Sequence, residues 1–375
     1  MTASSLSCRF QVSCVAERHA SPEMPAGPVT TLSADLRSSA NEALASVWPA
    51  SRDRTMRRTG HAAMVATMID EHNAMRIGPR FMVLEYNPII VVLEPQGGRM
   101  SVRPRSLPSG WYPTERGEVE AKLGAWGRVD EAARSEDLMA AIAPHAGWYY
   151  SGRIAWAAWR SAAESDAVVV VGGHLPAGAE FRYWDEDGFE TPLGLVKAEP
   201  SLTAAVAGVV AAVPDRHADN TVEIHLPMAA MRFPGIPVAC FRAPNDGRAS
   251  KLGKAVADWA MKSGKKVFVL GSTDLTHYGQ AYGFEPGGPG PDGFSWARRA
   301  DKAITDAFVG MDEAEALRRA ESDCSACSVG AAIAAISYAR RIGALRSRLL
   351  MRGSSDEGAP SSEASVGYCA VAYRV

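Results

Sequence analysis

The chain has 375 residues, 47% hydrophobic and 22% charged, which is typical of a globular protein with one large domain or two smaller ones. The formal net charge of −2 gives no electrostatic reason to expect binding to nucleic acid or to an anionic membrane. The sequence has no run of about 18 apolar residues, so we expect no transmembrane helix. Its six cysteines are too sparse for a disulfide framework, which favours a reducing, cytoplasmic location.

The first 99 residues differ in composition from the rest. Residues 1 to about 75 are rich in Ser, Ala, Arg and Thr, and we expect disorder up to about residue 60. Residues 82–94, MVLEYNPIIVVLE, predict one or two strands. The pattern of a folded domain begins at Met100, so we expect an extension over 1–99 and an α/β domain over 100–375. Met75 and Met100 are alternative translation starts.

From residue 100 onward, short apolar runs alternate with helical patterns. This alternation predicts an α/β fold with a mainly parallel sheet covered by helices on both faces. Strands are expected at 139–143, 167–172, 236–242, 266–271 and 367–373. Helices are expected at 118–126, 153–163, 201–213, 249–263, 296–309, 312–320 and 329–341.

Two connecting segments carry turn signals. Residues 181–197 resemble a hairpin, with Asp187-Gly188 as its turn. The Pro- and Gly-rich stretch 284–293 predicts a loop near the site that acts as a lid.

Polar residues follow three of the predicted strands at the point where each strand ends. His145 follows the first strand, His174 the second, and Asp274 and His277 come after strand 266–271. Because ligands of open α/β sheets bind beyond the carboxyl ends of the strands, these side chains are expected to meet at one edge. Each histidine alone is more readily explained as structural, whereas their convergence predicts an active or metal site.

A fourth polar segment lies between these strands. In 219–227, DNTVEIHLP, an extended backbone would point Glu223 and His225 the same way, since side chains alternate along a strand. We therefore place both residues among the candidate catalytic groups.

The Cys324-Ser-Ala-Cys327 pair has three interpretations. It is a redox disulfide, half of a structural zinc site, or the source of one thiolate ligand. The sequence has no second matched pair for zinc, and the position before a late helix is unlike thioredoxin. A helix N-terminus favours a thiolate, so we expect Cys324 to be the third ligand beside two histidines and Cys327 to be a buried packing residue.

Several motifs together resemble the Memo family, whose microbial members are called AmmeMemoRadiSam system protein B. The resemblance covers about residues 101–375. The motifs occur in family order: SGWYP (109–113), PHAGWYYSG (144–152), VVVVGGH (168–174), NTVEIHLP (220–227), GSTDLTHYG (271–279) and CSACSVG (324–330).

The resemblance implies a fold like that of the class III extradiol dioxygenases and a metal site of two histidines and one cysteine that holds iron or copper. Carried over to this chain, His145, His174 and Cys324 would be ligands. Asp274 and His277 would be acid/base or supporting groups, with His225 and Glu223 nearby.

This chain departs from the family pattern at several positions. Leu175 follows His174 where the family commonly has a second histidine, and Asn220 replaces a histidine. Ser325-Ala326 replaces a Gly-Arg pair. The expected ligands are kept while these other groups change, so the substrate is expected to differ from that of typical members.

Two classes of function follow. The first is a mononuclear iron or copper redox enzyme, dioxygenase-like, acting on an unknown small molecule or peptide. The second is a non-catalytic protein that binds a metal or a peptide in the same cleft. The resemblance also implies a functional link to a radical SAM protein, with no nucleic-acid or membrane partner.

Overall fold

The computed structural model describes residues 76–77, 82–86, 89–93, 100–129, 138–358 and 363–375. The chain forms two compact units, one of which contains Met100–Val375. In the other, β1 (Arg76–Ile77), β2 (Met82–Tyr86) and β3 (Ile89–Leu93) form an antiparallel sheet, and β2 and β3 are the strands predicted within 82–94. The disorder expected up to residue 60 lies outside the described residues.

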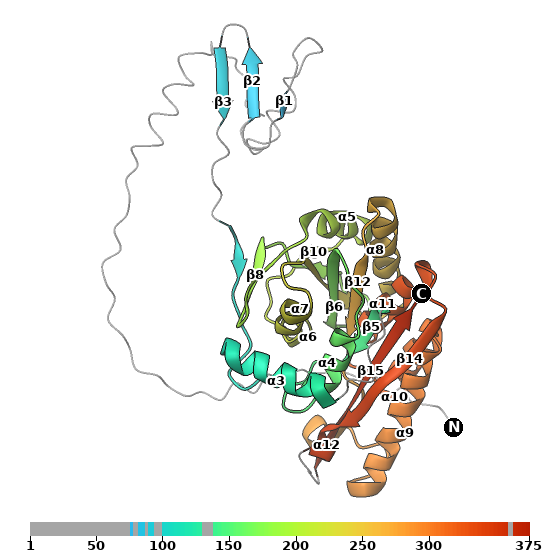
Figure 1. Ribbon diagram of the computed structural model, residues 1–375. Helices are drawn as coiled ribbons and strands as arrows, with labels where there is room; N and C mark the ends of the chain where they lie inside the picture. Colours follow the sequence, from blue (N-terminus) through green and yellow to red (C-terminus); the bar gives the residue numbers. More distant parts are fainter. Residues whose placement is uncertain (1–75, 78–81, 87–88, 94–99, 130–137, 359–362) are drawn as a thin grey trace, which may run out of the picture. The chain divides into compact units, whose positions relative to one another are not determined.

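A mixed sheet of nine strands forms the centre of the Met100–Val375 unit (Figure 1). Its four central strands are parallel, in the order β11-β6-β12-β5. They are β5 (Leu138–Ala143), β6 (Ala167–Leu175), β11 (Val238–Pro244) and β12 (Val267–Ser272). The antiparallel strand β15 (Ala364–Arg374) lies beside β5, and β13 (His277–Gly279) and β14 (Arg346–Ser354) pair with it. At the other edge are β7 (Arg182–Tyr183) and β10 (Val213–Pro214).

Helices cover both faces of this sheet, as the sequence predicts. Alternate residues of a strand enter opposite cores, so Val267 and Val269 of β12 pack on one side and Phe268 and Leu270 on the other. The first side carries α5 (Pro200–Val210), α8 (Ala249–Ser263), α9 (Gly290–Val309), α10 (Glu313–Asp323) and α11 (Val329–Arg341). The second carries α3 (Arg116–Val129), α4 (Gly152–Arg160), α6 (Asn220–Glu223) and α7 (Leu226–Arg232). The short α12 (Ser355–Gly358) and the 3-10 helix η2 (Gln280–Tyr282) complete the helices of the described part.

A small sheet contains the predicted hairpin with a different turn. β8 (Gly188–Thr191) and β9 (Gly194–Lys197) are antiparallel and turn after Thr191, so Gly188 is the first residue of a strand. The prediction of Asp187-Gly188 as the turn is therefore wrong. The Asp187 carboxylate instead accepts from the backbone of Ser101, beside the pairing of β8 with β4 (Val102–Arg103).

Two features of the C-terminal part differ from the sequence expectation. Strand β14 is not predicted from the sequence, because its residues alternate weakly in hydropathy and none of them is fully buried. The lid loop expected at 284–293 is shorter, because α9 already begins at Gly290, with proline in its first turn where a missing N–H costs nothing. The Tyr278 hydroxyl donates to the carbonyl oxygen of Gly288 (2.7 Å), which fastens this loop to β13.

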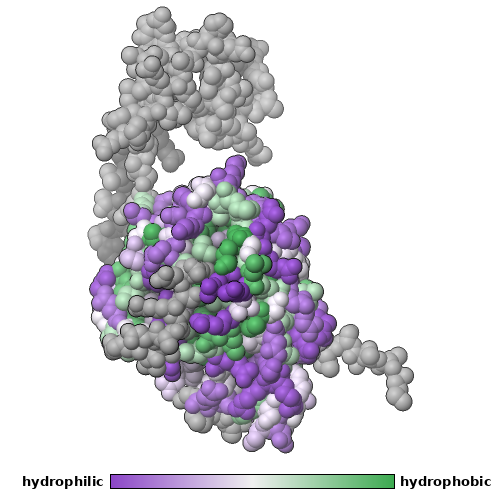
Figure 2. Space-filling view, turned by 45° about the vertical axis from the view of Figure 1, so that its right-hand side comes forward, coloured by the Kyte–Doolittle hydropathy of each residue, from purple (hydrophilic) through white to green (hydrophobic). Residues whose placement is uncertain are grey.

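The surface mixes hydrophilic and hydrophobic residues, and Figure 2 shows apolar patches among the hydrophilic ones on one face. In the part of the chain that the structure describes, none of the helices has the length and apolar character needed to cross a membrane.

Candidate metal centre

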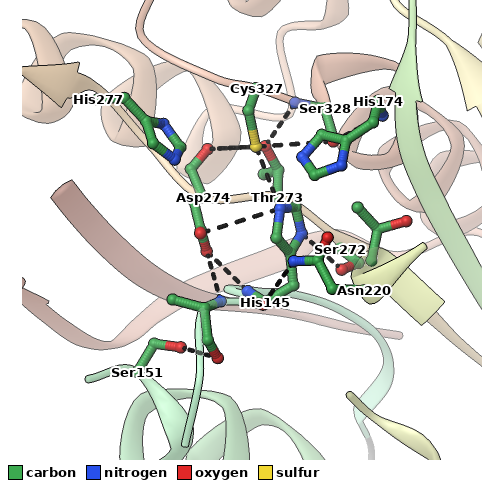
Figure 3. A network of polar contacts seen from close by, with 12 residues as sticks. His145, Ser151, His174, Asn220, Ser272, Thr273, Asp274, His277, Cys327 and Ser328 are labelled. Atoms are coloured by element: carbon green, nitrogen blue, oxygen red, sulfur yellow. Dashed lines mark hydrogen bonds and ion pairs between the residues drawn. The ribbon is translucent and has the colours of Figure 1, made fainter. Parts of the chain in front are cut away.

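Two histidines and a cysteine meet beyond the carboxyl ends of the central parallel strands. One potential ligand atom from each of His145, His174 and Cys327 lies within 4.8 Å of the others (Figure 3). The Cys327 sulfur is 3.2 Å from Nε2 of His145, and the two imidazole rings meet edge to face at 4.9 Å. His145 and Cys327 are buried, whereas the His174 side chain is 22% exposed. The group is therefore reached from solvent on the His174 side.

The two histidines lie where the sequence predicts them. His145 follows β5 after Pro144, which ends the strand, and His174 is the second-last residue of β6. The backbone of His174 is left-handed, with φ of 55°, a conformation that costs about 1–3 kcal/mol for a residue other than glycine. Its N–H donates to the hydroxyl of Ser328 (3.1 Å), which holds the strand end in this conformation.

The Gly172-Gly173 pair lets two other segments approach this strand end. A Cβ at Gly172 would collide with Thr221 of α6, and a Cβ at Gly173 would collide with the Ser328 side chain before α11. Since Ser328 directly follows Cys327, the absence of a side chain at Gly173 is what allows the cysteine to come near His174.

The cysteine of this group is Cys327, and the prediction of Cys324 is wrong. Cys324 ends α10 as its left-handed C-cap, whereas α11 begins only at Val329 with Ser328 before it. Helix α11 begins where it is predicted, but α10 extends to Asp323, beyond its expected end at residue 320. The dipole argument for a thiolate therefore applies to Cys327, two residues before the helix.

Backbone contacts hold the Cys327 loop against the end of β12. The Cys327 N–H donates to the carbonyl oxygen of Asp274 (3.3 Å), and the Asn245 side chain donates to the carbonyl oxygen of Cys327 (2.9 Å). The Ser328 N–H donates to Oγ1 of Thr273 (3.1 Å). The segments that follow β11 and β12 thus fix the position of the Cys327 loop.

His145 is held on both its backbone and its ring. Its N–H donates to Oδ1 of Asp274 (2.7 Å), and its carbonyl oxygen accepts from the Asn220 side chain (3.0 Å). Its Nδ1 lies 2.9 Å from the hydroxyl of Ser272, so Nε2 is the nitrogen that faces Cys327. These contacts together hold the His145 ring in a single orientation.

His174 is paired with a carboxylate that sequence analysis does not single out. Its Nδ1 lies 3.2 Å from Oδ2 of Asp219, and the same oxygen lies 3.1 Å from Nη2 of the buried Arg242. A carboxylate only accepts, so Nδ1 carries the proton and Nε2 is left for an ion. Burial opposes the charged imidazole, but the hydrogen bonds to Asp219 and Cys327 prevail and raise the pKa of His174 to about 10. The pKa of Asp219 falls to about 2, against its burial, because His174 and Arg242 stabilise the carboxylate.

The Cys327 thiol is shifted toward its ionised form. Burial opposes ionisation, yet the neighbouring His145 and His174 outweigh it and lower the pKa of Cys327 to about 6. In the metal-free protein at neutral pH, a thiolate therefore faces a protonated His174.

Asp274 and His277 lie beside the group, as predicted from their place after β12. Oδ2 of Asp274 is 3.9 Å from Nε2 of His145, and Oδ1 accepts from the N–H groups of His145 and Ala146. Burial raises the pKa of Asp274 and lowers that of His277, so both groups are disfavoured in their charged forms. His277 stacks edge to face on the partly exposed Tyr282 at 5.0 Å.

The expectation of an extended segment at Glu223 and His225 is wrong. Both residues lie in the helical turns of α6 and α7, where Asp219 caps α6 and proline follows in the first turn of α7, so their side chains do not share a direction. The buried Glu223 accepts from the N–H groups of Ser106 (2.9 Å) and Leu107 (3.0 Å) and from the Tyr112 hydroxyl (2.9 Å). Its described hydrogen bonds thus anchor the segment 106–112.

His225 is completely buried behind the group. Its Nδ1 accepts from the indole N–H of Trp159 (3.1 Å), and its Nε2 lies 3.0 Å from the Ser272 hydroxyl. It contacts His145 only through Ser272 in the described set of hydrogen bonds.

Sequence reasoning missed four residues of this site. Asp219 carries a detectable signal as the N-cap of a short helix, and Ser328 as a serine before an apolar helix. Ser272 and Arg242 lie in or at the end of apolar strands and carry no comparable local signal.

The donor set fits a borderline or soft transition metal. Two imidazoles and a thiolate suit iron, copper and zinc, whereas magnesium and calcium prefer oxygen ligands. The Asp219 contact to His174 matches the carboxylate support usual for histidine ligands.

Comparison with known proteins points to one family. The family model described as Memo-like protein matches residues 103–372. A MEMO1 family protein of Methanosarcina barkeri is 28% identical over 278 residues, 72% of this chain and 99% of that protein. One of Thermococcus kodakarensis is 27% identical over 294 residues, 73% of this chain and 99% of that protein.

Among solved structures, an uncharacterized protein of Escherichia coli K12 aligns with a TM-score of 0.39 and 11% identity. The alignment covers 61% of this chain and 99% of that one, and a likeness this distant adds nothing to the assignment. The family model spans most of the Met100–Val375 unit and all of the candidate metal centre, and on this ground the chain belongs to the Memo-like protein family.

Proposed function

We propose that this protein binds one iron or copper ion through Nε2 of His145, Nε2 of His174 and the Cys327 thiolate, and that it is a redox enzyme. The observation that carries the proposal is that these three side chains already lie together, with His145 and Cys327 buried and His174 partly exposed. Two imidazoles and one thiolate leave coordination positions open, at which such an ion would supply redox or Lewis-acid chemistry.

The residues around the group would bind the substrate and handle protons. His277 is disposed to be neutral, because burial lowers its pKa, and so offers a base. Asp274 is disposed to be protonated, because burial raises its pKa, and so offers an acid. Access from the His174 side would admit a small molecule or the end of a peptide. A dioxygenase-like reaction is the form of redox chemistry that the family resemblance suggests.

One observation favours the alternative of a binding protein without turnover. Oδ1 of Asp274 accepts from two backbone N–H groups and so helps to hold the turn at His145. A carboxyl group engaged in this way serves the fold whether or not it transfers protons. In that case the same cleft would hold a metal or a peptide, without chemistry.

Two measurements separate these possibilities. Anaerobically purified wild-type protein is first analysed for metal content beside Cys327→Ser. Oxygen consumption is then followed after loading with Fe(II) or Cu(I). Metal-dependent oxygen uptake that Cys327→Ser lacks supports the redox enzyme. Stoichiometric metal without uptake favours the binding protein, and absence of metal from every preparation refutes the site.

A further inference from the structure

Behind His145, three buried polar groups from three elements form a continuous row. Trp159 of α4, His225 before α7 and Ser272 at the end of β12 are all fully buried. The indole Nε1 of Trp159 lies 3.1 Å from Nδ1 of His225, whose Nε2 lies 3.0 Å from the Ser272 hydroxyl. The same hydroxyl lies 2.9 Å from Nδ1 of His145.

The chemistry of these groups fixes the direction of the hydrogen bonds. An indole N–H donates only, so Nδ1 of His225 must be the acceptor and carry no proton. His225 is then the neutral form with its proton on Nε2, and that N–H donates to the Ser272 hydroxyl. The surroundings of His225 also favour its neutral form, because burial lowers its pKa well below the usual range.

The hydroxyl of Ser272 is thereby held in one place. A serine hydroxyl otherwise rotates among three staggered positions. The donation from His225 occupies one lone pair and keeps the oxygen 2.9 Å from Nδ1 of His145. With Nδ1 held there, the ring presents Nε2 to Cys327 at 3.2 Å.

We propose that His225 is a positioning residue: locked by Trp159 in its Nε2–H form, it holds Ser272, which orients the His145 ring toward the metal position. The inference rests on the proposed function, since it assigns a role relative to the same site. It also replaces the expectation that His225 is a catalytic group, because the side chain is completely buried and meets the site only through Ser272 in the described hydrogen bonds.

The test compares two substitutions at one position. His225→Gln keeps an acceptor for Trp159 and a donor for Ser272, whereas His225→Leu keeps the bulk and removes both. The matched control is Tyr338→Phe. It removes another fully buried hydrogen bond, from the Tyr338 hydroxyl to the carbonyl oxygen of Val267 (2.6 Å), in the core on the other side of the sheet.

Each variant of the full chain is titrated with Co(II), whose absorption reports thiolate bonding and coordination geometry. We expect His225→Leu to bind Co(II) about tenfold more weakly than wild type, with altered absorption, since supporting residues typically contribute 10–100-fold in affinity. His225→Gln should restore most of the affinity and the spectrum, and Tyr338→Phe should match wild type. The proposal would be overturned by an equal loss of affinity in His225→Leu and His225→Gln, by no loss in His225→Leu, or by an equal loss in Tyr338→Phe.

A second measurement uses metal-free wild-type protein. Nitrogen-15 NMR of labelled histidine should find His225 neutral, with its proton on Nε2. A proton on Nδ1, or a charged ring near neutral pH, would refute the inference even if His225→Leu does not fold. Failure of wild type to bind Co(II) would refute the proposed metal site. The NMR result would still show whether His225 has the tautomer that its hydrogen bonds to Trp159 and Ser272 require.

Discussion

The sulfur of Cys327 lies 3.2 Å from Nε2 of His145, although 182 positions separate the two residues in the sequence. His145 is delivered by the end of a parallel strand and Cys327 by the loop before a helix packed on that sheet. The contact therefore depends on the docking of α11, and on the Gly173 position that admits Ser328.

The two cysteines of the Cys-x-x-Cys pair should respond differently to substitution. Cys327→Ser replaces a thiolate with a hydroxyl that stays protonated, so metal affinity should fall by more than the roughly 10–100-fold typical of losing a supporting residue. Cys324→Ser changes a residue outside the group and should keep its metal. Metal analysis of both variants checks this, and equal loss would mean that both sulfurs belong to the site.

Asp219→Asn should weaken metal binding by about 10–100-fold, because the carboxylate that supports His174 becomes a neutral amide. The change should also lower the pKa of His174 in the metal-free protein. The control is Asp185→Asn, which alters an ion pair with the exposed Arg216. Metal titration and histidine NMR are the measurements, and an affinity equal to that of the control would contradict the prediction.

Gly173→Ala should destabilise the fold by about 1–3 kcal/mol and weaken metal binding, since its methyl group would collide with Ser328 beside Cys327. Gly208→Ala is the control, and its effect on stability should have the opposite sign. Gly208 lies in α5 with nothing near its Cβ position, so alanine there should stabilise by roughly 0.5–1 kcal/mol. Urea unfolding measures both, and a neutral Gly173→Ala would show that the Ser328 loop adjusts freely.

Asp301 should make stability depend on pH. Burial raises its pKa from 3.8 to about 6, so between these values the folded state binds more protons than the unfolded state. The stability that wild type gains from this extra proton is fully present below about pH 4 and is lost as the pH rises through about 6. Asp301→Asn should therefore gain stability relative to wild type by on the order of 3 kcal/mol between pH 4 and 7.

Asp306→Asn on the same helix provides the comparison for Asp301. Its side chain is exposed and pairs only with the exposed Lys302 in the described ion pairs. The stability difference between Asp306→Asn and wild type should stay nearly flat over the same range. Parallel curves for the two variants, from urea unfolding at several pH values, would contradict the assignment to Asp301.

The sequence alone predicts the α/β architecture and half of the site. Runs such as 167–171, AVVVV, are fully apolar because both faces of a central parallel strand are covered, and polar residues follow where burial ends. That physical link between apolar run and strand end is local, so His145, His174 and Asp274 can be placed at one edge of the sheet without a structure.

Tertiary structure decides the parts that depend on distant contacts. The choice of Cys327 over Cys324 depends on how far α10 extends, because this helix runs to Asp323 and takes Cys324 as its C-cap. Glu223 binds Ser106 across 117 positions of sequence, and Asp219 meets His174 and Arg242 from separate elements. Local sequence determines which segments become strands and helices, because backbone preference and hydrophobic period act over a few residues. Which polar groups meet is decided only when those segments pack, because the energies of their contacts depend on partners that the local sequence does not contain.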